Sequence, residues 1–416
     1  MSTTPYDAAH EAMARARRRR RQNQQDNVYP LRSASWLNAC DLNGRGVPRS
    51  NLHNVLVALR NDEDWKDALG FDQMLQACVL RRSGHPLEDI DFERAHEWMQ
   101  DNQLKGIGLE VVREAIDIVC HDNLFHPLRD WLESLSWDGT LRLADWLHRY
   151  LGAPADSYHA SIGAWFLTAM VARVMRPGCK ADYMLVLEGP QGILKSAAVA
   201  VLAGEYYSDA LPDLSGDPIR LSMHLRGKWL VEVSELSAFS RAEASRLKAF
   251  LTQTTEIYTP KFARSEVRQP RQCVFVATTN DSTYLKDETG GRRFWPARCG
   301  KIDLPALRHD REQIIAEAVA AYRNGAQWWP DRDFETTIIA AEQEARLFVD
   351  AWQEPVQQYL AGRSRTTLME VAQGALYIEQ SRFTLPEQKR LATVLRAVNW
   401  ELKRSTGGSR IWAPRH

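Results

Sequence analysis

A lysine and a serine follow a glycine-containing turn near the middle of the chain. The turn is Gly189-Pro-Gln-Gly192, and Lys195-Ser196 come directly before an apolar, helix-forming run at 197–202. Glycines let backbone N–H groups surround an anion, and the N-terminus of a following helix adds its positive dipole end. The lysine can then reach the outer phosphates of a nucleotide, while the serine hydroxyl ligates Mg²⁺. The stretch predicts a nucleotide-phosphate site made of Gly189, Pro190, Gln191, Gly192, Ile193, Leu194, Lys195 and Ser196.

Leu194 stands directly before the lysine, where such loops usually have glycine. A side chain at this position either crowds the loop or changes its dihedral angles, because glycine alone adopts left-handed conformations freely. The sequence therefore locates the site and leaves its capacity for turnover open. An ordinary strand-to-helix turn that happens to contain Lys-Ser is the alternative interpretation.

Two carboxylates end the apolar run that begins at Trp229. Glu232 and Glu235 are three residues apart, so they share a site only if the strand ends between them. One acid at a strand end can hold Mg²⁺ through water, and a second can polarise the attacking water. We expect Glu235, at the predicted strand end, to be the metal-side acid together with Ser196. Alternatively, one member of the pair is only a surface glutamate.

A third apolar run, from Cys273 to Ala277, ends in Thr-Thr-Asn280. Ligands of α/β sheets bind at the carboxyl ends of the strands, so the Asn280 amide is predicted to contact the terminal phosphate or the attacking water. A polar strand terminus that simply turns into a loop is the alternative.

Two arginines follow a glycine pair further along. Arg292 and Arg293 carry guanidinium groups, which suit the spread negative charge of a phosphoryl-transfer transition state. On a loop, either could act on the site of a neighbouring subunit. The alternative is a structural salt bridge of one of them with Asp287 or Glu288.

Three short apolar runs separated by helical segments are typical of an α/β fold with a mostly parallel sheet. We expect a basic, disordered segment at 1–26, a helical domain at 27–180, the sheet-containing core at 181–330, and a helical linker with a small terminal domain at 331–416. In the last part, two amphipathic helices precede a hairpin with glycines at its tip, which is the pattern of a winged helix.

Composition narrows the class of protein without naming a partner. Basic and acidic residues both number 53, so a nucleic-acid site must be a local patch. The basic run Arg17 to Arg21 is either a solvated leader or a phosphate-binding arm. No pair of cysteines has metal-ligand or redox spacing, and no apolar run is long enough for a membrane span. A reduced, cytoplasmic protein without a membrane partner is expected. The cysteines are Cys40, Cys78, Cys120, Cys179, Cys273 and Cys299.

The order of these motifs resembles the virulence-associated protein E family, which belongs among the superfamily 3 helicase-like ATPases of phages and mobile elements. The resemblance rests on the lysine-containing loop, Trp229 to Glu235, Lys248-Ala-Phe250, Cys273 to Asn280 and the segment from Asp287 to Trp295. His126 to Leu132 and Trp137-Asp-Gly139 also resemble the helical region that precedes the core.

The resemblance implies an AAA+-like P-loop NTPase core, a homo-hexameric ring, and ATP- and Mg²⁺-dependent work on single-stranded or forked DNA. It assigns the phosphate-loop roles to Lys195 and Ser196, the acidic strand to Glu232 and Glu235, and the sensor to Asn280. Arg292 or Arg293 would be the finger that acts on the neighbouring subunit. A DNA-contacting hairpin is implied between the acidic and polar strands, where the basic residues are Lys261, Arg264 and Arg268; a solvated loop is the alternative.

Two classes of function remain from these observations. The first is an ATP-dependent DNA helicase or translocase, with the terminal domain able to contact duplex DNA at a replication origin. The second is a non-catalytic DNA-binding or interference protein with a degenerate nucleotide site. Priming activity is not expected, because we find no primase carboxylate cluster.

Overall fold

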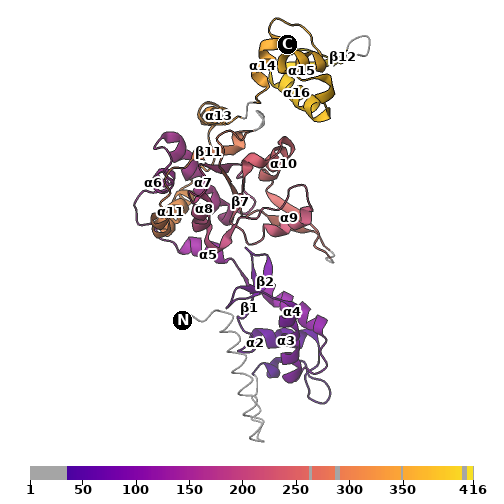
Figure 1. Cartoon of the computed structure of the whole chain (residues 1–416). Coiled ribbons are helices and arrows are strands. Elements are labelled where there is room, and N and C mark those ends of the chain that lie inside the picture. Colours follow the sequence, from indigo (N-terminus) through magenta and orange to yellow (C-terminus); the bar gives the residue numbers. More distant parts are fainter. Residues whose placement is uncertain (1–34, 262–264, 286–290, 348–349, 405–409, 416) are drawn as a thin grey trace. The chain divides into compact units, whose positions relative to one another are not determined.

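The computed structural model describes residues 35–261, 265–285, 291–347, 350–404 and 410–415. The chain forms two compact units, drawn in Figure 1: a larger one made of residues up to 282 and of 292–342, and a smaller one made of 283–291 and 343–416. The basic leader expected over 1–26 lies outside the described residues. Within the described segments, every helix is too short or too polar to span a bilayer.

A five-stranded parallel sheet forms the centre of the larger unit, with the strand order β11-β5-β10-β7-β6. Its three middle strands are buried along their whole length, which explains why their sequences are continuously apolar rather than alternating. The predicted parallel α/β sheet is therefore confirmed. The strands are β5 (Met184–Glu188), β6 (Tyr207–Ser208), β7 (Leu230–Val233), β10 (Val274–Thr279) and β11 (Phe294–Arg298).

Helices flank this sheet and share one hydrophobic core with it. The longest apolar helix, α7, is capped by the Asp156 side chain, which accepts the His159 N–H, and it is tied to β7 because Trp229 Nε1 donates to Met170 O at 2.8 Å. The boundary predicted at residue 180 therefore separates elements that pack together. The flanking helices are α5 (Pro127–Ser134), α6 (Trp146–Leu151), α7 (Ser157–Met175), α8 (Lys195–Ala203) and α11 (Leu304–Arg323).

A smaller sheet, of order β3-β2-β1-β4, lies in the region that we expected to be helical. Its strands are two to four residues long, too short for a period of two to stand out beside the helices that pack with them. These elements have a separate hydrophobic cluster. They are η1 (Ser35–Ala39), α2 (Leu52–Asn61), β1 (Leu69–Asp72), β2 (Ala77–Leu80), β3 (His85–Pro86), α3 (Asp89–Asp101), α4 (Leu109–Asp122) and β4 (Leu124–Phe125).

An antiparallel hairpin lies between the acidic and the polar strand in sequence. It consists of β8 (Thr255–Tyr258) and β9 (Val267–Pro270). The helices η3 (Leu236–Ala238) and α10 (Arg241–Leu251) lie between β7 and this hairpin. Two further helices, η2 (Gly204–Tyr206) and α9 (Pro218–His224), come before β7. Arg271 holds the base of the hairpin and is 1% exposed. Its guanidinium donates to Glu256 Oε1 at 2.5 Å, to Gln253 Oε1 at 2.8 Å and to Phe250 O.

The smaller unit contains the predicted order of two helices and a hairpin. Val371, Leu391 and Trp412 are among the residues of its hydrophobic core. The glycine tip of the hairpin, within 405–409, lies outside the described residues. The elements of this part are α14 (Gln353–Leu360), α15 (Leu368–Leu376), η6 (Gln380–Arg382), α16 (Leu385–Ala397), β12 (Trp400–Arg404) and β13 (Arg410–Pro414). Four short helices come earlier in the chain: η4 (Gly291–Arg293), α12 (Arg332–Phe334), η5 (Glu335–Ile339) and α13 (Ala340–Glu344).

The buried ion pair at the base of the hairpin gives a stability prediction. Arg271→Ala should lower the free energy of unfolding by about 3–5 kcal/mol, because it leaves the Glu256 carboxylate buried without its partner. Arg268→Ala on the same hairpin is the matched control: this side chain is 74% exposed and pairs with Glu266, so its loss should change stability by no more than about 0.5 kcal/mol. Chemical denaturation followed by circular dichroism measures both. Equal effects of the two substitutions would contradict the role given to Arg271.

Candidate functional site

The carboxyl ends of three neighbouring strands meet at one edge of the central sheet. Because β10 lies between β5 and β7, the segments that follow these strands surround a common cavity of about 390 Å³. The structure thus brings together the predicted loop, both predicted acids and the predicted amide. The cavity is lined by Gln191, Gly192, Ile193, Leu194, Lys195, Ser196, Ala197, Glu232, Ser234, Glu235, Thr278, Thr279 and Asn280.

Lys195 begins α8 and extends its ammonium group across the loop. Its Nζ donates to Gly189 O at 2.6 Å, to Pro190 O at 3.0 Å and to Asn280 Oδ1 at 3.1 Å. The residue is 7% exposed, and burial lowers the pKa of its ammonium group. A cation held by neutral oxygens inside a loop can exchange these partners for phosphate oxygens, which bind it more strongly because they are charged.

Glu232 is the most enclosed charged group of the site, with 1% of its surface exposed. Its Oε1 accepts from Ser196 Oγ at 2.7 Å and from Thr278 Oγ1 at 2.6 Å, and its Oε2 accepts from the Tyr207 hydroxyl. Burial, followed by the hydrogen bond to Glu232, raises the pKa of Tyr207 far above its usual range, so the phenol remains a donor. Three hydroxyl donors compensate the carboxylate for its lost hydration.

Glu232 and Glu235 do not take the positions that we expected from the sequence. β7 ends at Val233, so the strand does end between Glu232 and Glu235, and both line the cavity. The hydroxyl of Ser196 contacts Glu232, whereas Glu235 lies past the strand end in a left-handed turn with φ of 53° and is exposed. The acid beside Ser196 is therefore Glu232 and not Glu235, because Glu232 lies within β7 and Glu235 has already left the sheet.

Two contact residues were not predicted from the sequence. Tyr207 lies on β6, a strand of two residues that leaves no recognisable pattern. Thr278 belongs to the predicted polar strand end, but only the register of the parallel sheet, which pairs Val276 with Glu232, reveals its proximity to that acid. Neither residue carries a motif of its own.

Leu194 keeps the backbone conformation that glycine usually supplies. Its φ is 74° and its ψ 26°, and its carbonyl accepts the Ala198 N–H at 3.0 Å as the first bond of α8. Of the two expected consequences of a side chain here, a strained backbone is the one observed; a left-handed residue other than glycine costs about 1–2 kcal/mol. The side chain itself is 51% exposed.

Arg292 and Arg293 lie at the opposite edge of the sheet from this cavity. They directly precede β11, and β11 runs parallel to β5, with Phe294 beside Met184 and Arg298 beside Glu188. The glycine-containing loop begins only after the carboxyl end of β5, and a strand of five residues is roughly 16 Å long. The two arginines therefore lie about one strand length from the loop. Neither arginine lines the cavity. Their predicted partners Asp287 and Glu288 lie outside the described residues.

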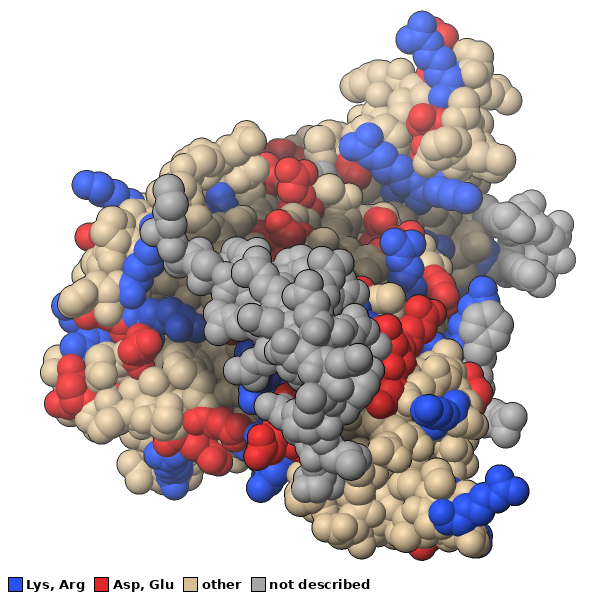
Figure 2. All heavy atoms as spheres, turned by 90° about the horizontal axis from the view of Figure 1, so that it is seen from below, with Lys and Arg blue, Asp and Glu red and all other residues tan. Residues whose placement is uncertain are grey.

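The predicted DNA-contacting residues are distributed over the β8–β9 hairpin. Arg268 is on β9 and pairs with Glu266 at 3.1 Å, Lys261 is exposed in the connecting loop, and Arg264 lies outside the described residues. On the face drawn in Figure 2, basic and acidic side chains are interspersed over the described surface, in keeping with the balanced composition.

Residues 132–347, more than half of the chain, match the model of the virulence-associated protein E-like domain. The chain belongs to this family. The matched region contains the loop, both acids, Asn280 and both arginines, whereas the small N-terminal sheet and α14 to α16 lie outside it.

No curated protein matches the chain. Among solved structures, the A form of the apo NrS-1 C-terminal region is 15% identical, with a TM-score of 0.45 over 84% of this chain and 96% of that one. A second A-form apo structure of that region is 14% identical, with a TM-score of 0.41 over 68% and 78% of the two chains. Similarities this remote do not carry a function from one protein to another.

The strain at Leu194 can be measured by comparing two substitutions. Leu194→Gly should be more stable than Leu194→Ala by about 1 kcal/mol, because both remove the same side chain and only alanine retains a Cβ in the left-handed conformation. Urea denaturation of the two variants gives the difference. The reverse order, alanine above glycine, is the behaviour of a position inside a helix and would contradict the φ angle described here.

Proposed function

We propose that this protein is an ATP-dependent DNA helicase or translocase of the superfamily 3 type, with an AAA+-like P-loop core, that acts in replication of a phage or other mobile element. The proposal rests above all on one observation: at the carboxyl ends of adjacent parallel strands, Lys195 donates a hydrogen bond to Asn280, and next to it Ser196 donates one to Glu232. Membership of the virulence-associated protein E-like family agrees with it.

In this proposal the loop from Gly189 to Ser196 holds the ATP phosphates with backbone N–H groups. Lys195 exchanges the Gly189 and Pro190 carbonyls for phosphate oxygens and keeps Asn280 within reach of the terminal phosphate. Exposed Glu235, on the same cavity, orients the attacking water, a role that requires solvent access.

The donor set suits Mg²⁺, a hard cation that prefers oxygen ligands. Ser196 Oγ and Glu232 Oε1 are 2.7 Å apart, so one hydroxyl and one carboxylate already lie together beside the loop. When bound there, Mg²⁺ supplies positive charge to the phosphoryl oxygens. Tyr207 and Thr278 then hold the Glu232 carboxylate in place through its two oxygens.

The position of the arginines supports a ring of identical subunits in this proposal. Arg292 and Arg293 are one strand length from their own cavity, so in the proposed mechanism they act on the cavity of another copy. Head-to-tail contacts of this kind form rings when their rotation closes. A homo-hexamer is the ring that the family resemblance implies.

DNA contacts are proposed on two elements. The β8–β9 hairpin carries exposed Lys261 and exposed Arg268, which can contact phosphate groups. The hydrogen bond of Arg271 to Glu256 holds the base of the hairpin in place, so these two side chains lie on a rigid element. The smaller unit, with its helices α15 and α16 followed by a hairpin, is proposed to be a winged helix that binds origin duplex DNA.

A non-catalytic DNA-binding protein is the second candidate function, and Leu194 is the observation that favours it. A left-handed leucine beside the catalytic lysine raises the free energy of the loop. This strain weakens the affinity of the loop for phosphate. ATP turnover separates the two candidates directly.

The lysine provides the first test. The wild-type chain should hydrolyse ATP, faster with single-stranded DNA, and Lys195→Ala should lower the turnover number on the order of 10²-fold or more. Lys180→Ala is the control, because this lysine is 69% exposed and pairs with Asp182 away from the cavity. A phosphate-release assay measures turnover, and unwinding of a forked duplex measures coupling. Equal background turnover of wild type and Lys195→Ala would exclude the helicase and leave the non-catalytic candidate.

Subunit mixing tests the arginines. The double variant Arg292→Ala/Arg293→Ala and the variant Lys195→Ala should each be inactive alone. An equal mixture should regain turnover, because about a quarter of the interfaces in a random ring combine an intact lysine with an intact arginine pair. The ATPase rate across mixing ratios is the readout. No recovery at any ratio, with mixed assembly verified by differently tagged subunits, would show that the arginines do not act across an interface.

A further inference from the structure

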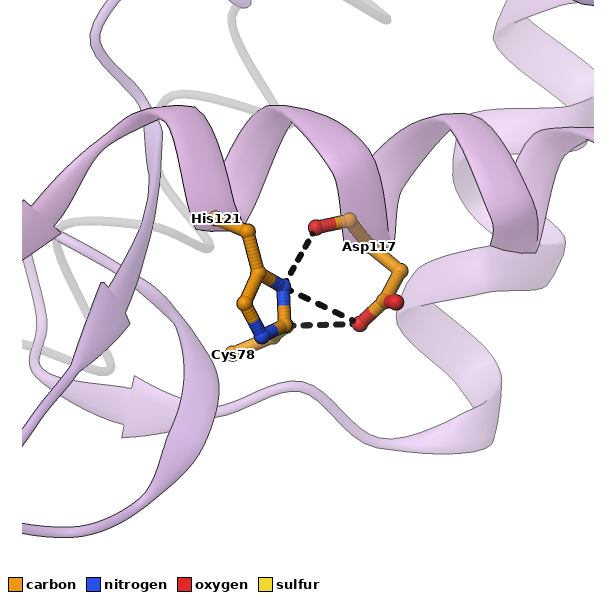
Figure 3. A group of neighbouring side chains, drawn as sticks. All are labelled: Cys78, Asp117 and His121. Carbon is orange, nitrogen blue, oxygen red and sulfur yellow. Dashed lines mark hydrogen bonds and ion pairs between the residues drawn. The ribbon is translucent and has the colours of Figure 1, made fainter. Parts of the chain in front are cut away.

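Three side chains with metal-ligating atoms converge in the N-terminal part of the larger unit, away from the candidate nucleotide site. Cys78 lies on β2, and Asp117 and His121 lie one turn apart on α4, which packs against this strand. Figure 3 shows the Asp117 carboxylate turned toward the His121 imidazole, with Cys78 next to the ring. One sulfur, one oxygen and one nitrogen atom, one from each residue, all lie within 4.8 Å of one another.

The geometry points to a binding site for a divalent transition-metal ion of the zinc type, with Cys78, Asp117 and His121 as ligands. Thiolate, imidazole and carboxylate are the ligands that Zn²⁺ takes in proteins. Nothing in the proposed ATPase chemistry uses these residues, so the inference stands independently of that function.

The distances fit a tetrahedral ion. Ligands at 2.0–2.3 Å from a tetrahedral Zn²⁺ lie roughly 3.3–3.8 Å from each other. Cys78 Sγ is 3.6 Å from Asp117 Oδ1, which lies within this range. The sulfur and the carboxylate oxygen therefore already have the spacing of two ligands of one ion, and the imidazole lies beside them.

The imidazole is held in place by neighbours that do not compete for all of its nitrogen atoms. His121 Nδ1 is 2.8 Å from the Asp117 backbone carbonyl, and the ring packs on Phe71 with centroids 4.5 Å apart. A carbonyl that accepts the Nδ1 proton leaves the Nε2 lone pair available, which is the usual second-sphere arrangement of a metal-binding histidine. Asp117 and His121 are exposed, so an ion can enter from solvent.

Cys120 adds a second sulfur beside the cluster. It is fully buried on α4, three residues after Asp117. The neighbouring Cys120 thiol, burial and the negative charge of Asp117 raise the pKa of the Cys78 thiol. A bound dication reverses that effect: the thiol releases its proton to solvent as the metal–sulfur bond forms.

A metal at this position would join β2 to α4 across the small N-terminal domain. The strands there are short and the domain depends on its own hydrophobic cluster, so a cross-link between sheet and helix stabilises it. The role is structural, since the cluster lies outside the cavity at the carboxyl ends of the central strands.

Cobalt titration tests the site. The full chain, without a polyhistidine tag and with its thiols reduced, is stripped with chelator and titrated with Co²⁺, whose thiolate charge-transfer and d–d absorption bands report sulfur ligation and tetrahedral geometry. We expect one equivalent to bind with both bands, and Zn²⁺ to displace it. Zn²⁺ should also raise the Tm. Ligand substitutions Cys78→Ser, Asp117→Asn and His121→Ala should each weaken binding by 10-fold or more, on the order seen when a metal site loses a partner.

Matched controls separate ligation from general damage. Cys40→Ser and His53→Ala change a thiol and an imidazole of the same domain that are not in the cluster, and they should bind Co²⁺ like the wild type. Far-UV circular dichroism verifies that each variant is folded. Absence of the thiolate band in the wild type, or an unchanged band in Cys78→Ser, would overturn the inference, as would a Cys78–Cys120 disulfide that forms in the presence of reductant and excludes the metal.

Discussion

The buried carboxylate of Glu232 is the group on which the arrangement of the candidate site depends. A carboxylate with 1% of its surface exposed must recover from protein donors the hydrogen bonds it loses to water. It does so from hydroxyls on three separate segments: Ser196 at the start of α8, Tyr207 on β6 and Thr278 on β10. The same contacts that satisfy the acid therefore fix the loop, the edge strand and the neighbouring strand relative to one another.

Two residues beside this acid have a strained backbone. Leu194 and Glu235, on the two segments that flank the cavity, both adopt left-handed conformations that residues with a Cβ avoid. Such conformations persist only where the surrounding structure determines them, and here a fully buried sheet on one side and a helix start on the other do so. Glycine adopts the φ angle of Leu194 without this cost.

The carboxyl ends and the amino ends of the strands in the central sheet carry different groups of residues. One edge gathers the loop, the acids and the amide around a cavity, and the other carries Arg292 and Arg293 at the start of β11. In a parallel sheet all carboxyl ends of the strands lie together and all amino ends lie together. The two groups are therefore one strand length apart. The two arginines are therefore not part of the cavity of their own chain.

The amino-acid sequence by itself determined the parallel sheet, the place of the loop and the identity of most residues around the cavity. Those features depend on local properties: continuous apolar runs for buried strands, and glycine, lysine and polar strand ends at readable spacings. Tertiary structure alone decided which acid meets Ser196, since that depends on where β7 ends. It also brought in Tyr207 from a two-residue strand, formed a short-stranded sheet where helices were expected, and joined α5 to α7 to the core across the predicted boundary. The convergence of Cys78 with Asp117 and His121 is of the same kind: ligands 39 residues apart in sequence have no recognisable spacing, and only the packing of a helix on a strand brings them together.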